Sequence, residues 1–326
     1  MHAIILKNPG EPEVLTWSQV LDLIPAPEQL LVRVKAAGLN RVDLLQRRGK
    51  YPPPPGESPI LGLEIAGEVA AMGKDVTHYQ VGDRVFGLVG SGGYAEYGVI
   101  DAKTAMLIPN ELSYIEAAAI PEAFLTANEA IFTLGELKAG ETILIHAGAS
   151  GVGSAGIQLA KQAGAVVFTT VSSPEKMQKV ATLQPTAIFN YKNQDFVTEI
   201  QTRTQHQGVN VILDFIGGSY LTRNMESLSA AGRLICVGLM GGATAEINLD
   251  VLLKKRLQIK GLIMRTRSPQ DKRMITERFK TTWLPLIANR QIKPIIDSVF
   301  ALKDASKAHA YMEKNVHIGK IVLEAE

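Results

Sequence analysis

The sequence predicts an α/β protein in which a doubly wound parallel sheet is joined to a distorted β-barrel. Strand-like and helix-like stretches alternate from residue 142 to residue 262, which is typical of parallel sheets. The first 120 residues carry short strand patterns punctuated by glycine and proline, as small barrels do. The length of 326 residues fits two domains or one large one.

The N-terminal part supplies the barrel strands. Residues 3–6 form a strand pattern, and residues 30–37 alternate apolar and basic positions as a half-buried strand does. Residues 42–49 resemble a short helix closed by glycine. Tyr51 and the four prolines at 52–55 form a stiff loop, because proline cannot join a helix interior or a central strand. Further strands are expected at residues 64–73 and 81–87 and after the glycine-rich turn in residues 90–97.

The second half supplies the parallel sheet. Good helix formers, including residues 123–133, precede it. Its six strands are expected from residue 142 onward and at residues 166–171, 187–190, 211–215, 233–237 and 258–262. Helical stretches over 271–288 and a last strand at 318–323 follow, and we expect this strand to return to the barrel. We therefore assign residues 1–120 and 268–326 to the barrel domain and residues 121–267 to the sheet domain.

A glycine-rich turn between the first sheet strand and its helix indicates a dinucleotide site. The turn can be read as Gly151-x-Gly153-x-x-Gly156 or as Gly148-x-Ser150-x-x-Gly153. We prefer the second reading, because Gly156 would already lie inside the helix. Free N–H groups and the macrodipole at the helix start favour a pyrophosphate. The alternative is a βα turn that binds no nucleotide. The predicted phosphate-binding residues are Gly148, Ala149, Ser150, Gly151, Val152 and Gly153.

The end of the second sheet strand favours NADPH over NADH. Ser172 and Ser173 stand where NAD-preferring sites place an acidic residue, and Lys176 follows one turn later. Hydroxyl groups and a cation suit a 2′-phosphate. The same residues also form a helix N-cap with a solvated lysine, and the two roles are compatible. Tyr191 ends the third strand and either contacts the adenosine phosphate or packs.

The fourth and fifth sheet strands end in glycine-rich stretches. In open α/β sheets the ligand lies beyond the carboxyl ends of the strands. Glycines there let the backbone approach the nicotinamide half of a cofactor. We interpret Asp214 as a turn or helix-cap carboxylate. The predicted cofactor contacts at these ends are Ile216, Gly217, Leu239, Met240 and Gly241.

Composition excludes several classes of protein. The net charge of +2 gives no field that demands nucleic acid or an acidic membrane. No apolar run approaches the length of a membrane span, and the first residues lack the long apolar segment of a secretory peptide. The single cysteine, Cys236, permits no internal disulfide and no Cys-rich zinc site. We expect a cytoplasmic enzyme.

Six motifs along the chain are similar to those of a known family. Over nearly its whole length the sequence resembles the medium-chain dehydrogenase/reductase superfamily, and within it the zinc-free quinone oxidoreductase (zeta-crystallin-like) family. The resemblance implies a Rossmann-type domain, a GroES-like barrel as catalytic domain, and reduction of quinones by NADPH, with ortho-quinones among the candidate substrates. The motifs are Gly38-Leu39-Asn40-Arg41-Val42-Asp43, Gly62-Leu63-Glu64-Ile65-Ala66-Gly67, Val81-Gly82-Asp83-Arg84-Val85, Ala118-Ala119-Ile120-Pro121, His146-Ala147-Gly148-Ala149-Ser150-Gly151-Val152-Gly153 and Gly319-Lys320-Ile321-Val322-Leu323.

The departures from the zinc-dependent relatives predict that no metal is bound. Asn40 stands where those relatives have Cys, and Leu63 stands where they have His. An amide and an aliphatic side chain cannot assemble a zinc site. Without a Lewis acid, deprotonating an alcohol is hard, whereas adding hydride to an electron-poor quinone is easier. Glu64, a neighbour of the metal in zinc relatives, is expected to be a structural salt-bridge partner here.

The resemblance also implies roles for single residues. Asn40, Tyr51 and Gln46 are the predicted catalytic or substrate-contacting residues, with Tyr51 as a quinone ligand or proton donor and packing as its alternative. His146 could act as a base, but we expect a hydrogen-bonded residue at the strand end. Further cofactor contacts are expected from Asn40, Thr126, Met264, Arg265, Asn315 and Lys320, with Thr126 facing the nicotinamide riboside and Arg265 near the nicotinamide amide.

Two other functions remain open from the sequence. One is a zinc-free enone or enoyl reductase of the same superfamily, because its hydride geometry is similar. The other is a non-catalytic NADPH-binding or RNA-binding crystallin-like protein. The basic clusters at 254–256 and 265–267 lack interleaved aromatics, so nucleic acid is not expected. The apolar strand at 257–262 is expected at a sheet edge and predicts a homodimer, with a tetramer as the alternative.

Overall fold

The chain divides into two units. The computed structural model describes residues 1–325. Unit 1 comprises Met1–Leu125 and Arg265–Glu326, and unit 2 comprises Thr126–Met264. The sequence placed these divisions at 120/121 and 267/268. In the structure, the first division lies between Leu125 and Thr126, inside the helix α3 (Pro121–Asn128). Each unit is described separately below.

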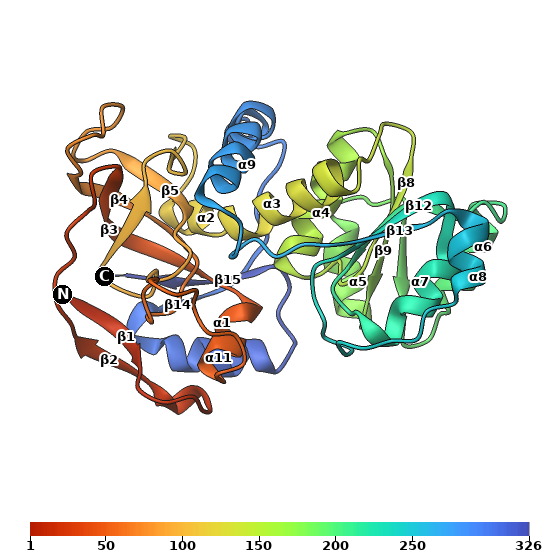
Figure 1. Ribbon diagram of the computed structural model, residues 1–326, viewed down its shortest axis with the longest axis horizontal. Coiled ribbons are helices and arrows are strands. Elements are labelled where there is room, and N and C mark those ends of the chain that lie inside the picture. The colour runs from red at the N-terminus through yellow and green to blue at the C-terminus, as the bar shows by residue number, and fades with distance from the viewer. Residues whose placement is uncertain (326) are drawn as a thin grey trace. The chain divides into compact units, whose positions relative to one another are not determined.

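Unit 1 is built on a seven-stranded sheet and a separate hairpin. The sheet order is β14-β15-β3-β4-β5-β7, with β6 paired to β3. β15 comes from the C-terminal end of the chain and pairs antiparallel with β3, so the predicted return to the barrel is confirmed. The strands, visible in Figure 1, are β1 (His2–Leu6), β2 (Leu15–Gln19), β3 (Gln29–Leu39), β4 (Glu64–Met72), β5 (Arg84–Leu88), β6 (Tyr97–Asp101), β7 (Met106–Leu107), β14 (Ile296–Ala301) and β15 (Lys320–Glu324).

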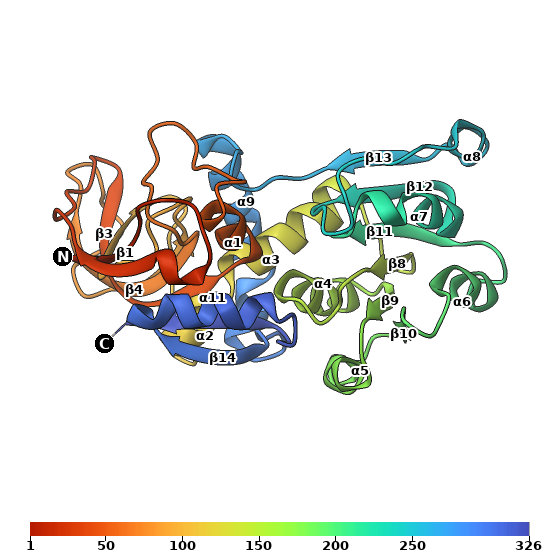
Figure 2. The same ribbon diagram turned by 90° about the horizontal axis from the view of Figure 1, so that it is seen from below.

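The helices of unit 1 lie at the ends and sides of this sheet. The core contains Leu30, Val32 and Ile65 from β3 and β4, and Ala308 and Met312 from α11. Figure 2 shows α11 beside β14. The helices are α1 (Arg41–Arg47), α2 (Tyr114–Ala118), the start of α3, α9 (Pro269–Thr282), α10 (Leu284–Ala288) and α11 (Ala305–Glu313), with single 3₁₀ turns η1 (Pro12–Val14) and η4 (Leu302–Asp304).

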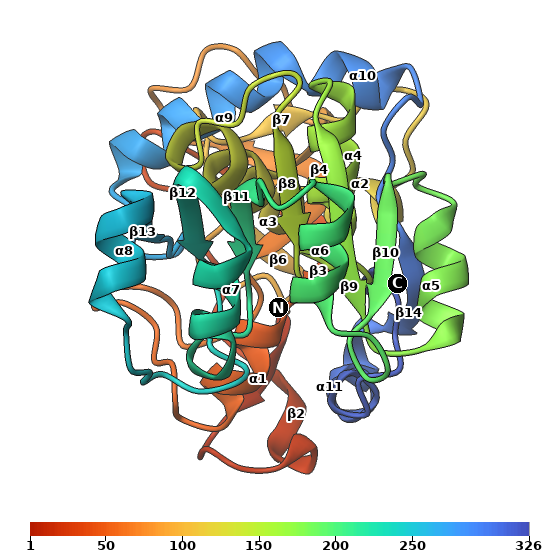
Figure 3. The ribbon, with the colours of Figure 1, turned by 90° about the vertical axis from the view of Figure 1, so that its right-hand side faces the viewer.

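Unit 2 is built on a six-stranded sheet in which every neighbouring pair is parallel. Its order is β10-β9-β8-β11-β12-β13, and Figure 3 shows the strands in this order from β13 on the left to β10 on the right. The order reverses between β8 and β11, which is the switch point of a doubly wound sheet. The strands are β8 (Thr142–Ile145), β9 (Val166–Val171), β10 (Ala187–Asn190), β11 (Val209–Asp214), β12 (Leu228–Cys236) and β13 (Gln258–Gly261).

Helices cover both faces of this sheet. Figures 1 and 2 show α4 and α5 on one face and α6 and α7 on the other. The core between them contains Leu144, Phe168, Phe189, Ile212 and Leu234. The helical segments are η2 (Glu129–Leu134, a π-helix), α4 (Gly151–Gln162), α5 (Pro174–Ala181), α6 (Phe196–Arg203), η3 (Gly218–Tyr220), α7 (Leu221–Ser227) and α8 (Leu249–Lys255).

Several predicted bounds were wrong, each for a local reason. The strand predicted from residue 81 begins at Arg84, after a turn at Gly82 with φ of 94°. The helix predicted over 123–133 changes to a π-helix at Glu129. The helical stretch predicted over 271–288 is two helices that meet at Trp283, because Pro285 cannot continue the hydrogen-bond ladder of α9. The strand predicted at 233–237 begins at Leu228.

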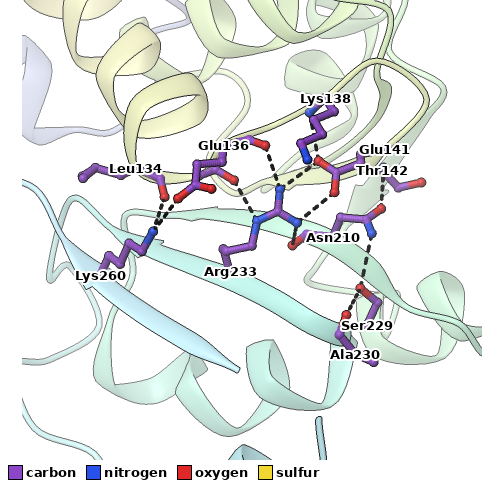
Figure 4. Close-up of polar contacts among 11 residues, drawn as sticks. Leu134, Glu136, Lys138, Glu141, Thr142, Asn210, Ser229, Ala230, Arg233 and Lys260 are labelled. Carbon is purple, nitrogen blue, oxygen red and sulfur yellow. Dashed lines mark hydrogen bonds and ion pairs between the residues drawn. The ribbon is translucent and has the colours of Figure 1, made fainter. Parts of the chain in front are cut away.

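A polar network joins the amino ends of the strands in unit 2 (Figure 4). Arg233 in β12 donates from Nη1 and Nη2 to the two carboxylate oxygens of Glu141, at 2.9 and 2.8 Å. It also donates to the backbone oxygens of Gly135, Glu136 and Asn210 at 2.8–3.3 Å. Burial raises the pKa of Glu141, but hydrogen bonds from Arg233 and from the Lys138 N–H outweigh it and leave a lowered pKa. We call these residues the Arg233 network.

Two further features of unit 2 bear on reactivity and assembly. Cys236 ends β12 as a free, half-buried thiol, and burial raises its pKa to about 11. β13 lies at the edge of the sheet order, as expected for the strand at 257–262. Across residues 1–325, no helix combines the length and the apolar character that crossing a membrane requires.

Candidate active site

The glycine-rich turn of unit 2 has the geometry of a phosphate-binding site. Ser150 is the N-cap of α4, and its Oγ accepts a hydrogen bond from the Gly153 N–H at 3.0 Å. Within residues 1–325, the N–H groups of Gly151 and Val152 have no hydrogen-bond partner. Two free N–H groups at the start of a twelve-residue helix favour a bound anion. The helix starts at Gly151, so Gly156 is inside it, as the preferred reading of the motif requires.

Small residues make this turn tight. Ala147 adopts a φ of 51°, which is uncommon for a residue with a side chain. A Cβ on Gly148 would overlap Thr169 Oγ1, and a Cβ on Gly153 would overlap the Ala147 carbonyl oxygen. Glycine is therefore required at both positions for the turn to pack against β9. The resulting arrangement fits the pyrophosphate of a dinucleotide.

The end of β9 is polar and carries the predicted 2′-phosphate residues. Ser173 is the N-cap of α5 and accepts from the Lys176 N–H at 3.3 Å, so the predicted capping role is confirmed. Ser172 and Lys176 are both partly buried beside it. Tyr191 is 38% exposed and makes an edge-to-face contact with Tyr220 at 6.4 Å. Two hydroxyl groups and one ammonium group therefore lie at this strand end.

The strand ends of β11 and β12 are held by backbone turns. Asp214 accepts from the N–H groups of Ile216 and Gly217 at 2.8 and 3.1 Å, which confirms its predicted role as a turn carboxylate. Burial raises the pKa of Asp214 to about 6. Gly217 has a φ of 78°, a conformation that favours glycine. The stretch after β12 is exposed at Leu239, Met240 and Gly241.

His146 is a structural residue rather than a base, as the sequence analysis favoured. Its ring is fully buried, with Nδ1 3.0 Å from Thr170 Oγ1 and Nε2 2.7 Å from Asn224 Oδ1. Burial lowers its pKa to about 4. A neutral imidazole with both nitrogens engaged has no capacity left for proton transfer.

In unit 1, a buried cation joins Asn40 to Glu64. Lys320 Nζ donates to Asn40 Oδ1 and Glu64 Oε1 at 2.6 Å each, and to the Leu39 carbonyl oxygen at 3.0 Å. Asn40 Nδ2 closes the cluster with a 2.8 Å bond to Glu64 Oε1. Lys320 and Glu64 are 4% and 0% exposed, so the predicted salt-bridge role of Glu64 is confirmed. All three donors of the Lys320 ammonium group are used within this cluster.

Two further carboxyl groups surround this cluster. Asp43 is fully buried and accepts from the N–H of Asn40 at 2.8 Å and from the hydroxyl of Tyr94 at 3.0 Å. Burial raises the pKa of Asp43 to about 6. Glu122 is partly buried at the start of α3, and its N–H donates to Glu64 Oε2 at 2.7 Å. Burial, and then the negative charge of Glu64, raises the pKa of Glu122 to about 7. Both acids can therefore carry a proton near neutral pH.

Arg265 is a buried cation with few partners. The residue is 6% exposed, and Nη1 donates to Gln46 Oε1 at 2.8 Å. Gln46 is itself fixed by a 3.1 Å bond from its Nε2 to the Pro59 carbonyl oxygen. Within residues 1–325, Nε and Nη2 of Arg265 make no hydrogen bond. Glu57 Oε2 approaches Nε only to 3.5 Å. Each unsatisfied buried donor costs about 1–3 kcal/mol.

Tyr51 completes what we call the Arg265 cluster, namely Arg265, Gln46, Tyr51 and Glu57. The Arg265 guanidinium carbon lies 5.6 Å from the centroid of the Tyr51 ring. Burial raises the pKa of Tyr51, the Arg265 charge lowers it, and Glu122 and Glu57 raise it. The phenol therefore stays protonated at neutral pH and can donate a hydrogen bond. Two of the three predicted catalytic residues, Gln46 and Tyr51, are thus brought together by Arg265.

The remaining predicted residues occupy separate places. Thr126 in unit 2 is 4% exposed, and within residues 1–325 its Oγ1 has no hydrogen-bond partner. Such an orphaned buried hydroxyl fits a polar group of a ligand. Met264 is buried at the end of unit 2. Asn315, with a φ of 59°, accepts from Arg41 Nη2 at 2.6 Å in unit 1.

Sequence reasoning did not predict roles for Glu122 and Glu57. Glu122 follows Pro121 in the first turn of a helix, a position where an acid ordinarily only complements the macrodipole. Glu57 stands in the loop after the prolines, where a lone acid reads as a solvated residue. For Glu122 the signal would have been an acid directly after the motif residue Pro121, whereas Glu57 stands six positions after Tyr51 and carries no such signal.

The donor set of unit 1 does not fit zinc. Asn40 offers an amide and Leu63 an aliphatic side chain, and the carboxylate of Glu64 is already neutralised by Lys320. Zinc sites use Cys, His and carboxylate ligands. Throughout the part of the chain that the structure describes, no group of three His, Cys, Asp or Glu side chains could hold a metal ion. No step of the chemistry below is therefore assigned to a metal.

Comparisons with known proteins agree with this architecture. The family "Alcohol dehydrogenase GroES-like domain" matches residues 26–110, and the family "Zinc-binding dehydrogenase" matches residues 151–281. The chain is 31% identical to the quinone oxidoreductase of Rattus norvegicus over 327 residues, which cover 99% of this chain and 97% of the relative.

Solved structures are similar over the whole chain. A mycobacterial protein complexed with NADPH has a TM-score of 0.90 at 27% identity and covers 99% of this chain and 100% of its own. The enoyl reductase CurK has a TM-score of 0.89 at 28% identity and covers 100% of this chain and 99% of its own. The similar proteins are thus named for different substrates, a quinone in one case and an enoyl group in another.

Proposed function

Because the chain belongs to the medium-chain dehydrogenase/reductase superfamily, in its quinone oxidoreductase-like family, and is an oxidoreductase, we propose that it reduces quinones with NADPH and without zinc. The observation that carries this proposal is the Asn40–Glu64–Lys320 cluster. Asn40 and Leu63 stand at the positions where zinc-dependent relatives are expected to carry Cys and His, and Lys320 bonds both Asn40 and Glu64. An electron-poor carbonyl acceptor needs less Lewis-acid activation than an alcohol donor.

The residues of unit 2 would hold the cofactor. The free N–H groups of Gly151 and Val152 would bind the pyrophosphate. Ser172, Ser173 and Lys176 would bind the 2′-phosphate, and the similar mycobacterial protein was solved with NADPH. The orphaned hydroxyl of Thr126 would bind the nicotinamide riboside. When bound, NADPH supplies the hydride. The other proposed contacts are Gly148, Ala149, Ser150, Gly153, Tyr191, Ile216, Gly217, Leu239, Met240, Gly241, Met264 and Asn315.

The residues of unit 1 would bind and orient the quinone. Tyr51 is the proposed proton donor, because its phenol stays protonated at neutral pH. Lys320 donates to Asn40 Oδ1 and to Glu64, and Asn40 Nδ2 donates to Glu64. We therefore propose that Asn40 and Lys320 hold the local backbone and the buried charges in place, in addition to any direct contact with the cofactor. Ortho-quinones are among the proposed substrates.

Turnover with defined cofactors tests the proposal. The purified, chelator-treated protein should oxidise NADPH in the presence of 1,4-benzoquinone or a larger ortho-quinone. Lys176→Ala should raise KM for NADPH about tenfold, the loss of one charged hydrogen bond, and leave the weaker NADH reaction unchanged. The exposed Lys179 on the same helix gives the matched control, Lys179→Ala. Equal rates of the wild type with NADH and NADPH would contradict the proposed 2′-phosphate pocket. No oxidation of NADPH with either quinone would contradict the quinone assignment.

The second candidate is a zinc-free reductase of enones or enoyl thioesters. It is favoured by the full-length similarity to the enoyl reductase CurK. The same assay with an alkenal and an enoyl thioester separates the two functions, because kcat/KM ranks the acceptors directly. A non-catalytic NADPH-binding or RNA-binding protein would bind NADPH tightly and reduce none of these acceptors.

We also propose a homodimer formed through the edge of the unit 2 sheet. β13 has one free edge, and Ile259 on it is 40% exposed. The neighbouring α8 exposes Leu253 at 73%. Unpaired apolar edge strands favour pairing with a second copy. Light scattering on the eluting protein measures the mass, and a monomer across the micromolar range would contradict the proposal. Location in the cytoplasm stays a prediction of the sequence.

A further inference from the structure

We infer that the guanidinium group of Arg265 binds the carbonyl oxygen of the substrate and stabilises the negative charge that this oxygen gains during reduction. The inference rests on the proposed reductase function and gives Arg265 a substrate role in place of the cofactor contact expected from the sequence. It would make Arg265 a catalytic residue and Gln46 the residue that positions it.

The side chain of Arg265 is buried, yet within the described part of the chain most of its donors make no hydrogen bond. A guanidinium has five N–H donors, and here the residue is 6% exposed. One hydrogen bond is present, from Nη1 to Gln46 Oε1 at 2.8 Å. Across residues 1–325, Nη2 and Nε have no hydrogen-bond acceptor. Buried polar groups in folded proteins are nearly always paired, so unpaired donors indicate a missing ligand.

The hydrogen-bond partner of Arg265, Gln46, is an uncharged side chain. Gln46 Oε1 is neutral, so it orients the guanidinium without cancelling its charge. Gln46 is 4% exposed and bonded to the Pro59 carbonyl oxygen, which fixes its own amide. The carboxylate of Glu57 forms an ion pair with Arg265, 3.5 Å from Nε, and Nη2 still makes no hydrogen bond within residues 1–325. A preoriented cation with an unpaired donor is the arrangement that stabilises a developing oxyanion.

A phenol lies beside this guanidinium group. Tyr51 presents its ring to Arg265, with 5.6 Å between the guanidinium carbon and the ring centroid. A flat conjugated acceptor such as a quinone could stack in the same manner on the guanidinium plane. Tyr51 also carries an O–H donor, so an acceptor oxygen would find both a cation and a proton donor here.

The chemical step balances as follows. One hydride, which is two electrons and one proton, passes to the quinone and converts it to the hydroquinone monoanion. The electron pair that leaves the carbonyl bond resides on oxygen, where Nη2–H of Arg265 donates a hydrogen bond to it. One further proton, from the Tyr51 hydroxyl and then from water, gives the neutral hydroquinone. Bound NADPH would supply this hydride and would thereby be oxidised by two electrons.

The test uses 4-nitrocatechol, a stable analogue of the reduced product whose phenolate absorbs visible light. Titrating it in complex with the wild-type protein should show an ionisation at least one pH unit lower than in water, the size expected beside a close cation. Arg265→Met should abolish that shift, Arg265→Lys should keep part of it, and Gln46→Met should reduce it. Arg267→Met, two residues along the same segment, is the matched control and should keep the full shift. This readout needs no turnover.

Kinetics and cofactor binding complete the test. Arg265→Met should lower kcat/KM for the quinone about 100-fold or more, as loss of an oxyanion donor does, while the Kd of NADPH changes less than threefold. A rise in the Kd of NADPH with an unchanged 4-nitrocatechol titration would overturn the inference and assign Arg265 to the cofactor. Full quinone turnover by Arg265→Met would also overturn it and leave the reductase function intact. If the wild type reduces no quinone and binds no 4-nitrocatechol, both proposals fail.

Discussion

Arg233 in unit 2 and Arg265 in unit 1 are both largely buried arginines with opposite bonding. The guanidinium of Arg233 meets both carboxylate oxygens of Glu141 and three backbone oxygens. That of Arg265 meets one amide oxygen, although the residue is 6% exposed. The side chain of Arg233 is the more exposed of the two, at 11% against 3%. Burial alone therefore does not explain which arginine acquires partners.

The difference separates a stabilising cation from a functional one. A buried ion pair contributes to stability only when its geometry is good and its remaining donors are satisfied. The Arg233 network meets both conditions at the amino ends of the strands, where α/β sheets do not bind ligands. The Arg265 cluster meets neither condition. A protein retains the free-energy cost of a buried cation with unpaired donors where activity requires it. Three substitutions would break or sharpen this contrast.

The largest effect on stability is expected at Arg233. Arg233→Met leaves the Glu141 carboxylate and three backbone oxygens without their shared donor, so the free energy of unfolding should fall by about 3 kcal/mol. Urea denaturation at pH 7 measures it. Because Glu141 has a lowered pKa in the folded protein, this contribution is present above its unfolded pKa of 4.5 and is lost as the pH falls below that value. The difference between variant and wild type should therefore shrink in acid.

A surface pair provides the control for this substitution. Arg203 pairs with Glu199 on α6 with side chains 49% and 32% exposed. Arg203→Met should change the free energy of unfolding by about 0.5 kcal/mol or less. Equal losses at Arg203 and Arg233 would mean that the network in Figure 4 contributes no more than an exposed pair.

The second effect is expected at Glu122 and depends on pH. Its pKa is about 7 in the folded protein against an ordinary value of 4.5. Between these values the folded state binds more protons than the unfolded state, so stability falls as the pH rises. Glu122→Gln removes this penalty and should raise the free energy of unfolding by about 2 kcal/mol at pH 8, with little change at pH 4.

Thermal unfolding of Glu122→Gln and wild type between pH 4 and pH 8 measures this difference. Glu111→Gln, at an exposed position, is the matched control. A constant gap between Glu122→Gln and wild type at all pH values would rule out a raised pKa as the cause.

The smallest effect on stability is expected at Arg265 itself. Arg265→Met removes one hydrogen bond but also the cost of a buried, under-bonded cation, so the free energy of unfolding should change by about 1 kcal/mol or less. The same urea denaturation compares it with Arg233→Met. A loss as large as that of Arg233→Met would show that Arg265 is a structural residue and would erase the contrast between the two.

Most of unit 2 could be predicted because its signals are local. The strands β9 and β10 have the predicted bounds, since each is a short apolar run closed by Ser172 or Tyr191. The start of α4 followed from Ser150 and the glycines beside it. Local patterns fail where polar positions interrupt them. The hairpin strand β2 and the helix α11 were not predicted, because Leu15–Gln19 and Ala305–Glu313 mix apolar and polar residues without a clean period.

The candidate site was less predictable than the fold. The family motifs named Asn40, Gln46 and Tyr51, but the partners that define their chemistry come from far along the chain. Arg265 bonds Gln46 across 219 residues, and Lys320 bonds Glu64 across 256. No spacing rule links residues at such separations, because the sheet pairing of β15 with β3 brings Lys320 to Asn40. The incomplete bonding of Arg265 is visible only in three dimensions.

Cys236 makes this chain a convenient background for site-directed labelling. It is the single thiol in the sequence, and a pKa of about 11 keeps it protonated at neutral pH. Maleimide and iodoacetamide probes react with the thiolate, so a cysteine introduced at an exposed position would be modified selectively. Paired fluorophores, one on each unit, would then report distance changes in solution when NADPH is added, with the native residue left in place.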